Sequence, residues 1–502
     1  MEQIINETNP TIDPQPVTST LPAMAEGEGE GHDEDEDYTP VPTAILPIKD
    51  KELPPIIREI VTNAPLRCKI PSFVASLSPL CALASRLRAK YYRDTNRLHA
   101  LLLQVIIEGA QSSGKSFAAD IESLIMNNTL KAHDKAQRRL EQEYREKKKR
   151  RAQNRQLEEE PQTTIRVIPP TISKTVLTKR ADFYERILGD TMTFWMFAEE
   201  LAPVTDAGKA GYSNLRTIMR TAYDLGSLFG IDYASDNSYS AIVDINICSM
   251  FCATPSALDE YYDRKAIEGG NITRCIVCPL EDDVESDNET FLPYSPEQMK
   301  TINQTLELMM NDNYDAYDHL QPTKLLNMPW IERDCKTFIR RKAREFCLTG
   351  SEAVKVFRKR SSVSAFRIAC LCYYLYALEM GFDPCISNED EKDEGAKRAR
   401  QRAQQLCRKI YHFMSEFIIE QMLRRWGKRF NEMNSKRQED ADSEDKSLYN
   451  MLTPEFTRDQ LKLLIRQLGC TTPAKQFVWL WGPKQMNIIE IVDKNHFKKK
   501  NV

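Results

Sequence analysis

Short runs of apolar residues alternate with helical segments through the middle of the chain. The runs lie at residues 101–107, 164–168, 192–198, 245–252 and 275–280. A continuous apolar run is typical of a strand buried on both faces of a parallel sheet, whereas the segments between the runs have apolar positions at helical spacing. The alternation predicts an α/β fold with a mostly parallel sheet in a three-layer core.

The segments on either side of this core have different patterns. Residues 49–100 are expected to form an N-terminal helical region, and residues 286–430 a longer helical region that acts as a lid. Residues 431–447 are polar and are predicted to be a linker. The core itself is assigned to 101–285, and a small separate module to 448–502.

The C-terminal module is expected to contain helices at 456–468 and 473–480, a strand at 488–492 and a basic end. Two helices, a turn and a β-wing are the parts of a winged helix, whose second helix enters the DNA major groove. Trp479 and Trp481 are candidates for stacking on bases, with burial in the module core as the alternative. The module is interpreted as a DNA contact, with docking onto another protein as the second interpretation.

Charge is distributed unevenly along the chain. Residues 1–48 contain eleven Asp and Glu residues and no Lys or Arg, and they are predicted to be a disordered, solvated tail. The run 26–37 could instead mimic DNA or bind a basic partner. Because the whole chain has a net charge of −4, residues 49–502 have +7. This mildly basic remainder permits nucleic acid as a partner without requiring it.

A charged helix is predicted at 129–160. Its residues 131–155 include eleven Lys and Arg but four Asp and Glu. Apolar positions are too sparse for a sustained coiled coil, so the segment is interpreted as a helix that projects into solvent. A DNA-contacting arm is the alternative.

Several classes of protein are excluded. No apolar run approaches the roughly 20 residues of a membrane span, and the N-terminus lacks the pattern of a signal peptide. The 13 cysteines are scattered, which suits buried thiols in a reducing compartment. Cys275 and Cys278 lie three apart on a predicted strand, which favours burial over zinc binding. We expect a cytoplasmic protein that does not associate with a membrane.

The clearest chemical signal is a full match to the P-loop (Walker A) pattern that binds nucleotide phosphates. Lys115 would neutralise the β- and γ-phosphates of ATP, and the Ser116 hydroxyl would ligate Mg²⁺. A predicted strand precedes the pattern and a predicted helix follows it, as phosphate binding at a helix N-terminus requires. The nucleotide-binding residues are predicted to be Gly109, Ala110, Gln111, Ser112, Ser113, Gly114, Lys115, Ser116 and Phe117.

A P-loop ATPase also needs an acidic residue at the end of a neighbouring apolar strand. Glu199 and Glu200 directly follow the run 192–198. Glu199 would hold the Mg²⁺ shell, although Asp is usual at this position, and Glu200 would orient and deprotonate the attacking water. A surface acidic pair is the alternative.

Two further catalytic candidates follow in the chain. In additional-strand P-loop ATPases, a polar residue at the end of a strand between the P-loop and acidic strands senses the γ-phosphate, and Thr254 fits this position. Arg274 precedes the next strand. In oligomeric ATPases such an arginine reaches the γ-phosphate of a neighbouring subunit and adds roughly 10³–10⁵ to the rate. A structural salt bridge is the alternative role for Arg274.

These motifs together resemble the primase-associated P-loop ATPases of phages and bacterial mobile elements, a family long catalogued as a domain of unknown function. The resemblance covers roughly residues 50–430. Beyond the P-loop it includes 170–174 (PTISK), 221–224 (TAYD), 230–232 (GID), 254–255 (TP), 271–274 (NITR) and 357–369 (FRKRSSVSAFRIA).

The resemblance implies a helicase-like, ring-forming homo-oligomer with a RecA/AAA+-like core that works on single-stranded or forked DNA. Members are often fused to a primase, but the segment before residue 50 has no room for one. If priming is needed, we therefore expect a separate protein to supply it. Arg360 or Arg367 would be the lid arginine that contacts the nucleotide. A nucleotide-switched DNA-binding or loader protein without unwinding activity is the alternative function, and a defence or regulatory ATPase a weaker third.

Overall fold

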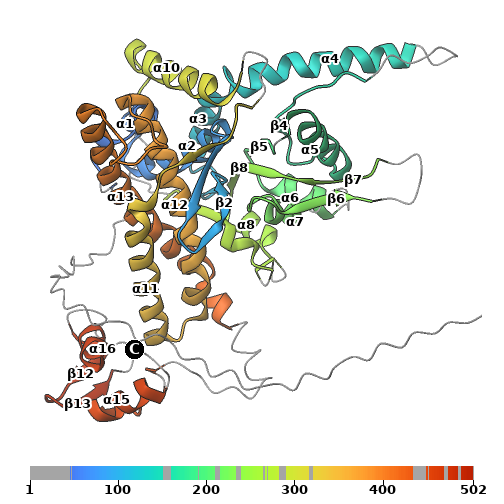
Figure 1. The fold of residues 1–502 in the computed structure, drawn as a ribbon. Helices are drawn as coiled ribbons and strands as arrows, with labels where there is room; N and C mark the ends of the chain where they lie inside the picture. The colour runs from blue at the N-terminus through green and yellow to red at the C-terminus, as the bar shows by residue number, and fades with distance from the viewer. Residues whose placement is uncertain are drawn as a thin grey trace, which may run out of the picture. The chain divides into compact units, whose positions relative to one another are not determined.

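The computed structural model describes residues 46, 48–150, 160–189, 191–209, 215–232, 239–263, 266–267, 269–281, 290–315, 320–432, 448–449, 451–467, 473–483 and 488–500 (Figure 1). Most of the predicted acidic tail lies outside these residues. The same holds for residues 151–159 of the predicted charged helix and for residues 433–447 of the predicted linker.

The central sheet contains five parallel strands: β3 (Gln104–Glu108), β4 (Val167–Ile168), β5 (Thr193–Ala198), β8 (Asn246–Ala253) and β9 (Cys275–Pro279). Their order is β4-β5-β8-β3-β9. β3 and β8 are buried along their whole length, which explains their continuous apolar sequences. Each strand overlaps one predicted run, so the predicted α/β fold with a parallel sheet is confirmed.

Helices pack on this sheet in a way that is compatible with a three-layer core. α2 (Lys69–Leu83) contacts β3, β5, β8 and β9. Its Ser78 hydroxyl lies within hydrogen-bonding distance of the carbonyl oxygens of Leu103 and Ser249, at 2.8 and 2.9 Å. Around the core lie α1 (Pro55–Thr62), α3 (Phe117–Met126), α4 (Leu130–Arg150), α5 (Lys174–Leu188), α6 (Ala202–Lys209), α7 (Leu215–Thr221) and α8 (Pro255–Tyr261), with a hairpin of β6 (Leu228–Ile231) and β7 (Ala241–Asp244).

The predicted helical region at 286–430 is helical through most of its described length. It contains α10 (Pro296–Asn313), α11 (Glu332–Thr349), α12 (Glu352–Met380) and α13 (Glu394–Met422). α12 and α13 pack against each other, and buried residues of both belong to the same hydrophobic core as the central sheet.

The predicted N-terminal helical region differs from the structure over its last residues. After α1 and α2, the chain forms β1 (Leu87–Tyr91) and β2 (Asp94–Ala100), which pair antiparallel. β1 also pairs with β10 (Lys324–Leu326) in a separate three-stranded sheet. The strands were missed because β1 is only 5 residues long and one of its partners lies far along the chain.

One helix in the described part of the chain, α12, is long and apolar enough to cross a membrane. Its most apolar window has a mean hydropathy of 1.2, and 94% of that window is buried inside the protein. Burial of this kind favours a core helix over a membrane-spanning one.

The C-terminal module has two helices and a small antiparallel sheet. Its elements are β11 (Glu455–Thr457), α15 (Arg458–Gln467), α16 (Ala474–Trp481), β12 (Ile489–Ile491) and β13 (His496–Lys499). The strand order is β11-β13-β12, so the predicted basic end is partly a strand. Trp481 is fully buried against the rings of Phe456 and Phe477, whereas Trp479 is 53% exposed.

Candidate nucleotide-binding site

The loop between β3 and α3, residues 109–116, folds back tightly on itself. The backbone N–H of Gly109 donates to the Ala253 carbonyl at 3.0 Å. A Cβ atom on Gly109 would lie 2.5 Å from the Ser113 hydroxyl oxygen, so a larger residue would require the Ser113 side chain to move. Ser112 and Gly114 both have positive φ, 65° and 82°. The left-handed turn at Ser112 is uncommon for a residue with a side chain, and such strain is concentrated at functional sites.

Lys115 points its ammonium group back into the curve of this loop. Its Nζ donates to the carbonyl oxygens of Gly109, at 2.9 Å, and Ala110. The positive charge therefore lies among the loop residues, directly before the N-terminus of α3. Backbone turns of this kind beside a helix N-terminus form anion-binding sites.

Ser116 is the N-cap of α3, but its side chain makes no capping hydrogen bond, and the residue is exposed. A serine hydroxyl at this position, next to the turn, is the oxygen ligand that a P-loop offers to Mg²⁺. The loop, the lysine and this hydroxyl together fit a nucleotide phosphate with its metal ion.

The two predicted acidic residues reach the same edge of the sheet. Glu199 and Glu200 are exposed directly after β5 ends at Ala198. β8 lies between β5 and β3, with Phe251 opposite Ala198 and Cys252 opposite Ile107. Burial raises the pKa of Cys252 to about 12, while the charge of Lys115 lowers it and that of Glu199 raises it. Cys252 lies on the strand between β3 and β5, and its thiol is influenced by the charges of both the loop lysine and the first of the two carboxylates.

Thr254 lies at the same edge, one residue beyond β8. Its hydroxyl oxygen caps α8 by accepting from the Ala257 N–H at 3.3 Å, and it lies 3.1 Å from the Ser256 hydroxyl. The residue has a structural role as an N-cap. Its position beside the end of β3 also suits the predicted sensor of the γ-phosphate.

Two arginines that the sequence analysis did not identify reach this edge. Arg67 donates from Nη1 to the carbonyl oxygens of Ser113, at 3.4 Å, and Glu281, at 3.2 Å. Arg425 contacts Glu108, with 3.0 Å between Nε and Oε1, and donates to the Pro255 carbonyl at 2.8 Å. No local motif marks either residue, because both come from helical segments remote in sequence from the loop.

Arg274 lies at the amino ends of the parallel strands, whereas the loop lies at their carboxyl ends. Cys275, which follows it, pairs with Gln104 at the start of β3, whereas the loop follows the end of β3. Arg360 and Arg367 lie there as well: Arg367 Nη1 donates to the Leu102 carbonyl at 2.8 Å. The structure therefore does not bring Arg360 or Arg367 to the loop of the same chain.

These three arginines surround one carboxylate, that of Asp224. Arg360 Nη1 lies 3.1 and 3.2 Å from its two oxygens, Arg367 Nη2 lies at 3.5 Å and Arg274 Nη2 at 3.8 Å. The ring of Tyr223 lies below the Arg367 guanidinium, 4.1 Å from centroid to Cζ. Burial raises the pKa of Asp224, but the three guanidinium groups lower it by more, so the pKa lies below its usual value.

Replacing Asp224 with Asn is expected to destabilise the protein more at neutral than at acidic pH. Removing one partner of a buried ion pair costs about 3–5 kcal/mol, and the partial exposure of Asp224 reduces this cost. Because its folded-state pKa is lowered, the carboxylate stabilises the fold above the unfolded-state pKa of about 4, and this is lost as the pH falls through the folded-state value. Thermal unfolding at pH 7 and pH 3.5 measures the difference.

Asp232, which is exposed, provides the control substitution Asp232→Asn. We expect this change to leave the melting temperature close to that of the wild type at both pH values. If the difference in melting temperature between the wild type and Asp224→Asn is the same at pH 7 and pH 3.5, Asp224 is not an ionised partner of the arginines.

No family model matches the chain, and no curated protein matches it significantly. Among the described residues, no group of three or more His, Cys, Asp and Glu side chains is arranged to hold a metal ion by itself. Cys275 and Cys278 are both buried, in agreement with their predicted structural role.

Proposed function

We propose that this protein is a P-loop ATPase with a RecA/AAA+-like core that uses Mg²⁺ and ATP to translocate on or unwind DNA. The observation that carries the proposal is that the loop and the acidic pair lie at the same edge of the sheet. Lys115 lies in the 109–116 loop after β3, and Glu199 and Glu200 follow β5, which is separated from β3 by β8. This is the strand arrangement expected of an additional-strand P-loop ATPase.

The residues at this edge divide the chemistry of hydrolysis between them. Lys115 would exchange its two backbone carbonyl partners for β- and γ-phosphate oxygens, which offer a charge-assisted contact instead of neutral ones. Mg²⁺, held by Ser116 and Glu199, would neutralise phosphate charge. Glu200 would accept the proton of the attacking water, and Thr254 would report on the γ-phosphate.

The placement of Arg274 supports action between subunits. An arginine at the edge of the sheet opposite the loop does not serve its own chain's nucleotide, whereas in a homo-oligomer it can face the loop of the next subunit. Asp224 would hold Arg274 in position until the neighbouring phosphate competes for it.

The fold of the C-terminal module supports a winged-helix-like DNA contact. α15 and α16 are followed by the β12 and β13 strands, which form a wing-like hairpin. Exposed Lys475, Gln476 and Trp479 on α16 are suited to phosphate contacts and base stacking. Together with the resemblance to primase-associated ATPases, this favours a role in replication of a phage or mobile element, in the cytoplasm.

The proposal is tested by measuring ATP hydrolysis by the purified protein with and without single-stranded DNA, beside the Lys115→Ala variant. We expect turnover that DNA stimulates and that the variant loses. Strand displacement on forked DNA then separates a helicase from a loader, which binds ATP and DNA and unwinds nothing. Failure to bind ATP would overturn the proposal, while binding without turnover would move it to the loader.

A further inference from the structure

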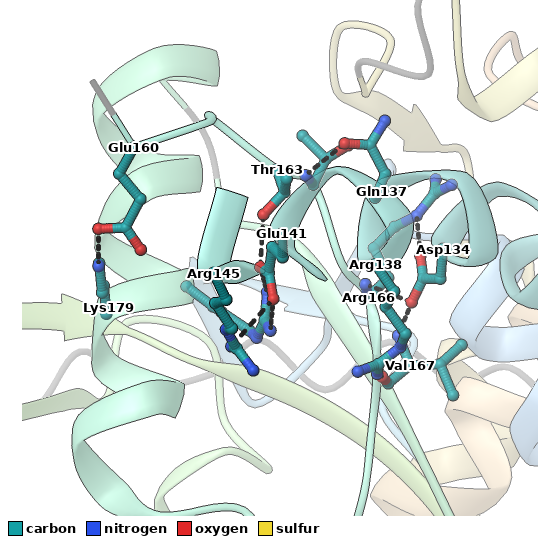
Figure 2. Close-up of polar contacts among 12 residues, drawn as sticks. Asp134, Gln137, Arg138, Glu141, Arg145, Glu160, Thr163, Arg166, Val167 and Lys179 are labelled. Atoms are coloured by element: carbon teal, nitrogen blue, oxygen red, sulfur yellow. Dashed lines mark hydrogen bonds and ion pairs between the residues drawn. The ribbon is translucent and has the colours of Figure 1, made fainter. Parts of the chain in front are cut away.

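The helix α4 is fixed to the protein at its N-terminal half by side chains that point inward (Figure 2). Asp134, which is 2% exposed, accepts the backbone N–H groups of Arg166 and Val167 at 2.8 and 2.6 Å. Arg138 donates in turn to the Val167 carbonyl at 2.6 Å. α4 is therefore joined to the short strand β4 at the edge of the central sheet.

A second inward contact lies two turns further along the helix. Glu141 accepts from the Thr163 hydroxyl at 2.6 Å and from both Arg180 terminal nitrogens at 2.9 and 3.2 Å (Figure 2). Burial raises the pKa of Glu141, but the bonds from Arg180 and Thr163 and the charge of Arg180 outweigh this and lower it. Asp134 and Glu141 are seven residues apart, so they lie on one face of the helix.

The outer surface of α4 is left basic by this arrangement. Residues 130–150 include nine Lys and Arg against four Asp and Glu, and two of those four are the inward Asp134 and Glu141. Glu143 is paired with Arg139 at 2.9 Å, and Glu146 accepts from Gln142 at 3.2 Å. Lys135, Lys147, Lys148 and Lys149 of this helix are exposed.

The shape and chemistry of this surface suit a polyanion. The helix has 21 residues and is therefore about 31 Å long. Its exposed side chains include one large apolar residue, Leu140, which is too little for a membrane-binding or protein-docking stripe. Repeated positive charge without an apolar face is the pattern that binds phosphate backbones.

The base of α4 is also connected to the candidate nucleotide site. Glu122 of α3, 1% exposed, accepts from Lys131 of α4 at 2.6 Å and from the Trp195 indole N–H at 2.9 Å. α3 begins at the end of the 109–116 loop, and Trp195 lies on β5, which leads to Glu199. One buried carboxylate thus joins the helix after the loop, the strand before the acidic pair and the charged helix.

We propose that α4 is a nucleic-acid-binding arm, whose exposed lysines contact the phosphate backbone and whose docked base transmits this contact to the nucleotide site. The second part rests on the proposed function, because it requires ATP turnover to be stimulated. The first part, binding of nucleic acid by the arm, does not depend on it.

The binding test compares two triple variants of the full-length protein by titration with fluorescently labelled single-stranded DNA at several salt concentrations. The arm variant is Lys147→Ala, Lys148→Ala and Lys149→Ala. The control changes three exposed helical lysines elsewhere: Lys300→Ala, Lys409→Ala and Lys428→Ala. We expect the arm variant to bind at least about tenfold more weakly at low salt. The negative slope of log K against log salt should become less steep by about 2.

Arginine in place of the three arm lysines should restore binding, because the charge and not the lysine itself makes the contact. Equal affinity and equal salt slope for the wild type, the arm variant and the control would overturn the proposal. So would an arm variant that loses binding of a peptide of residues 26–37 but keeps DNA binding, because the arm would then bind an acidic peptide.

The coupling is measured on the same proteins as ATP turnover with saturating DNA. For the arm variant we expect turnover to fall to the level measured without DNA, and for the control we expect full stimulation. If the wild type hydrolyses no ATP in either condition, the proposed ATPase function fails, and the DNA titration still decides whether the arm binds nucleic acid.

Discussion

Replacing Glu200 with Gln is expected to abolish ATP turnover while ATP still binds. A positioned general base contributes about 10²–10⁴ to a rate, and glutamine cannot accept the proton of the attacking water. The 109–116 loop and Lys115, which would carry the affinity for the phosphates in the proposed site, are unchanged by this substitution. The measurement is turnover by phosphate release beside binding of a fluorescent ATP analogue, with a loss of at least about 100-fold in the first and little change in the second.

Glu199→Gln provides the matched control one residue away. In the proposed mechanism this change would remove a carboxylate from the shell of the metal ion and leave the general base, so its lost activity should return in part at raised Mg²⁺ concentration. Glu200→Gln should show no such recovery. Turnover at the wild-type rate in Glu200→Gln would show that another group activates the water and would remove Glu200 from the catalytic set.

The core of the candidate site could be predicted because its signals are local. β3 and β8 are buried on both faces and therefore appear as continuous apolar runs, and the loop pattern fits within eight consecutive residues. Glu199 and Glu200 follow from the same logic, since parallel strands end at a common edge of the sheet. The features that could be predicted, the buried strands, the loop and the acidic pair, are thus those that residues close together in the sequence determine.

The remaining features depend on contacts between segments that are far apart in the sequence. Arg425 meets Glu108 and Arg67 meets Ser113 only after the helical regions have packed against the core. Likewise, the cluster around Asp224 draws Arg360 and Arg367 from α12 to the other edge of the sheet, although their motif suggested a contact with the nucleotide. Charge and spacing predict such residues as binding groups but do not identify their partners.

The charged helix illustrates the same difference. Its composition predicted a projecting, solvated helix, because sparse apolar residues give no reason for docking. In the structure, α4 docks through polar side chains at Asp134 and Glu141, whose partners at 163–180 lie across a gap in the described chain. Polar docking leaves no periodic apolar signal, which is why the pattern alone indicated exposure along the whole helix.

Asp134→Ala is expected to be among the most destabilising single changes in the described part of the chain. Asp134 satisfies two backbone N–H groups and lies 3.9 Å from the Arg166 guanidinium, which is fully buried over the Tyr314 ring. Without the carboxylate, both N–H groups lose their acceptor and the Arg166 guanidinium loses its opposite charge, which costs about 3–5 kcal/mol of stability. Urea unfolding should therefore show a clearly lower midpoint, and hydrogen exchange should show lost protection at the base of α4.

Replacing both partners separates the buried charge from the fit of the helix. In Asp134→Leu with Arg166→Met, no charge is left buried, and exchanging a buried pair for apolar residues of similar size is often neutral or stabilising. The double variant should recover part of the urea midpoint and not all of it, because the two backbone N–H groups still lack their acceptor. If Asp134→Ala alone unfolds within about 1 kcal/mol of the wild type, the pair does not fix α4. The contact with Glu141 would then have to hold the helix.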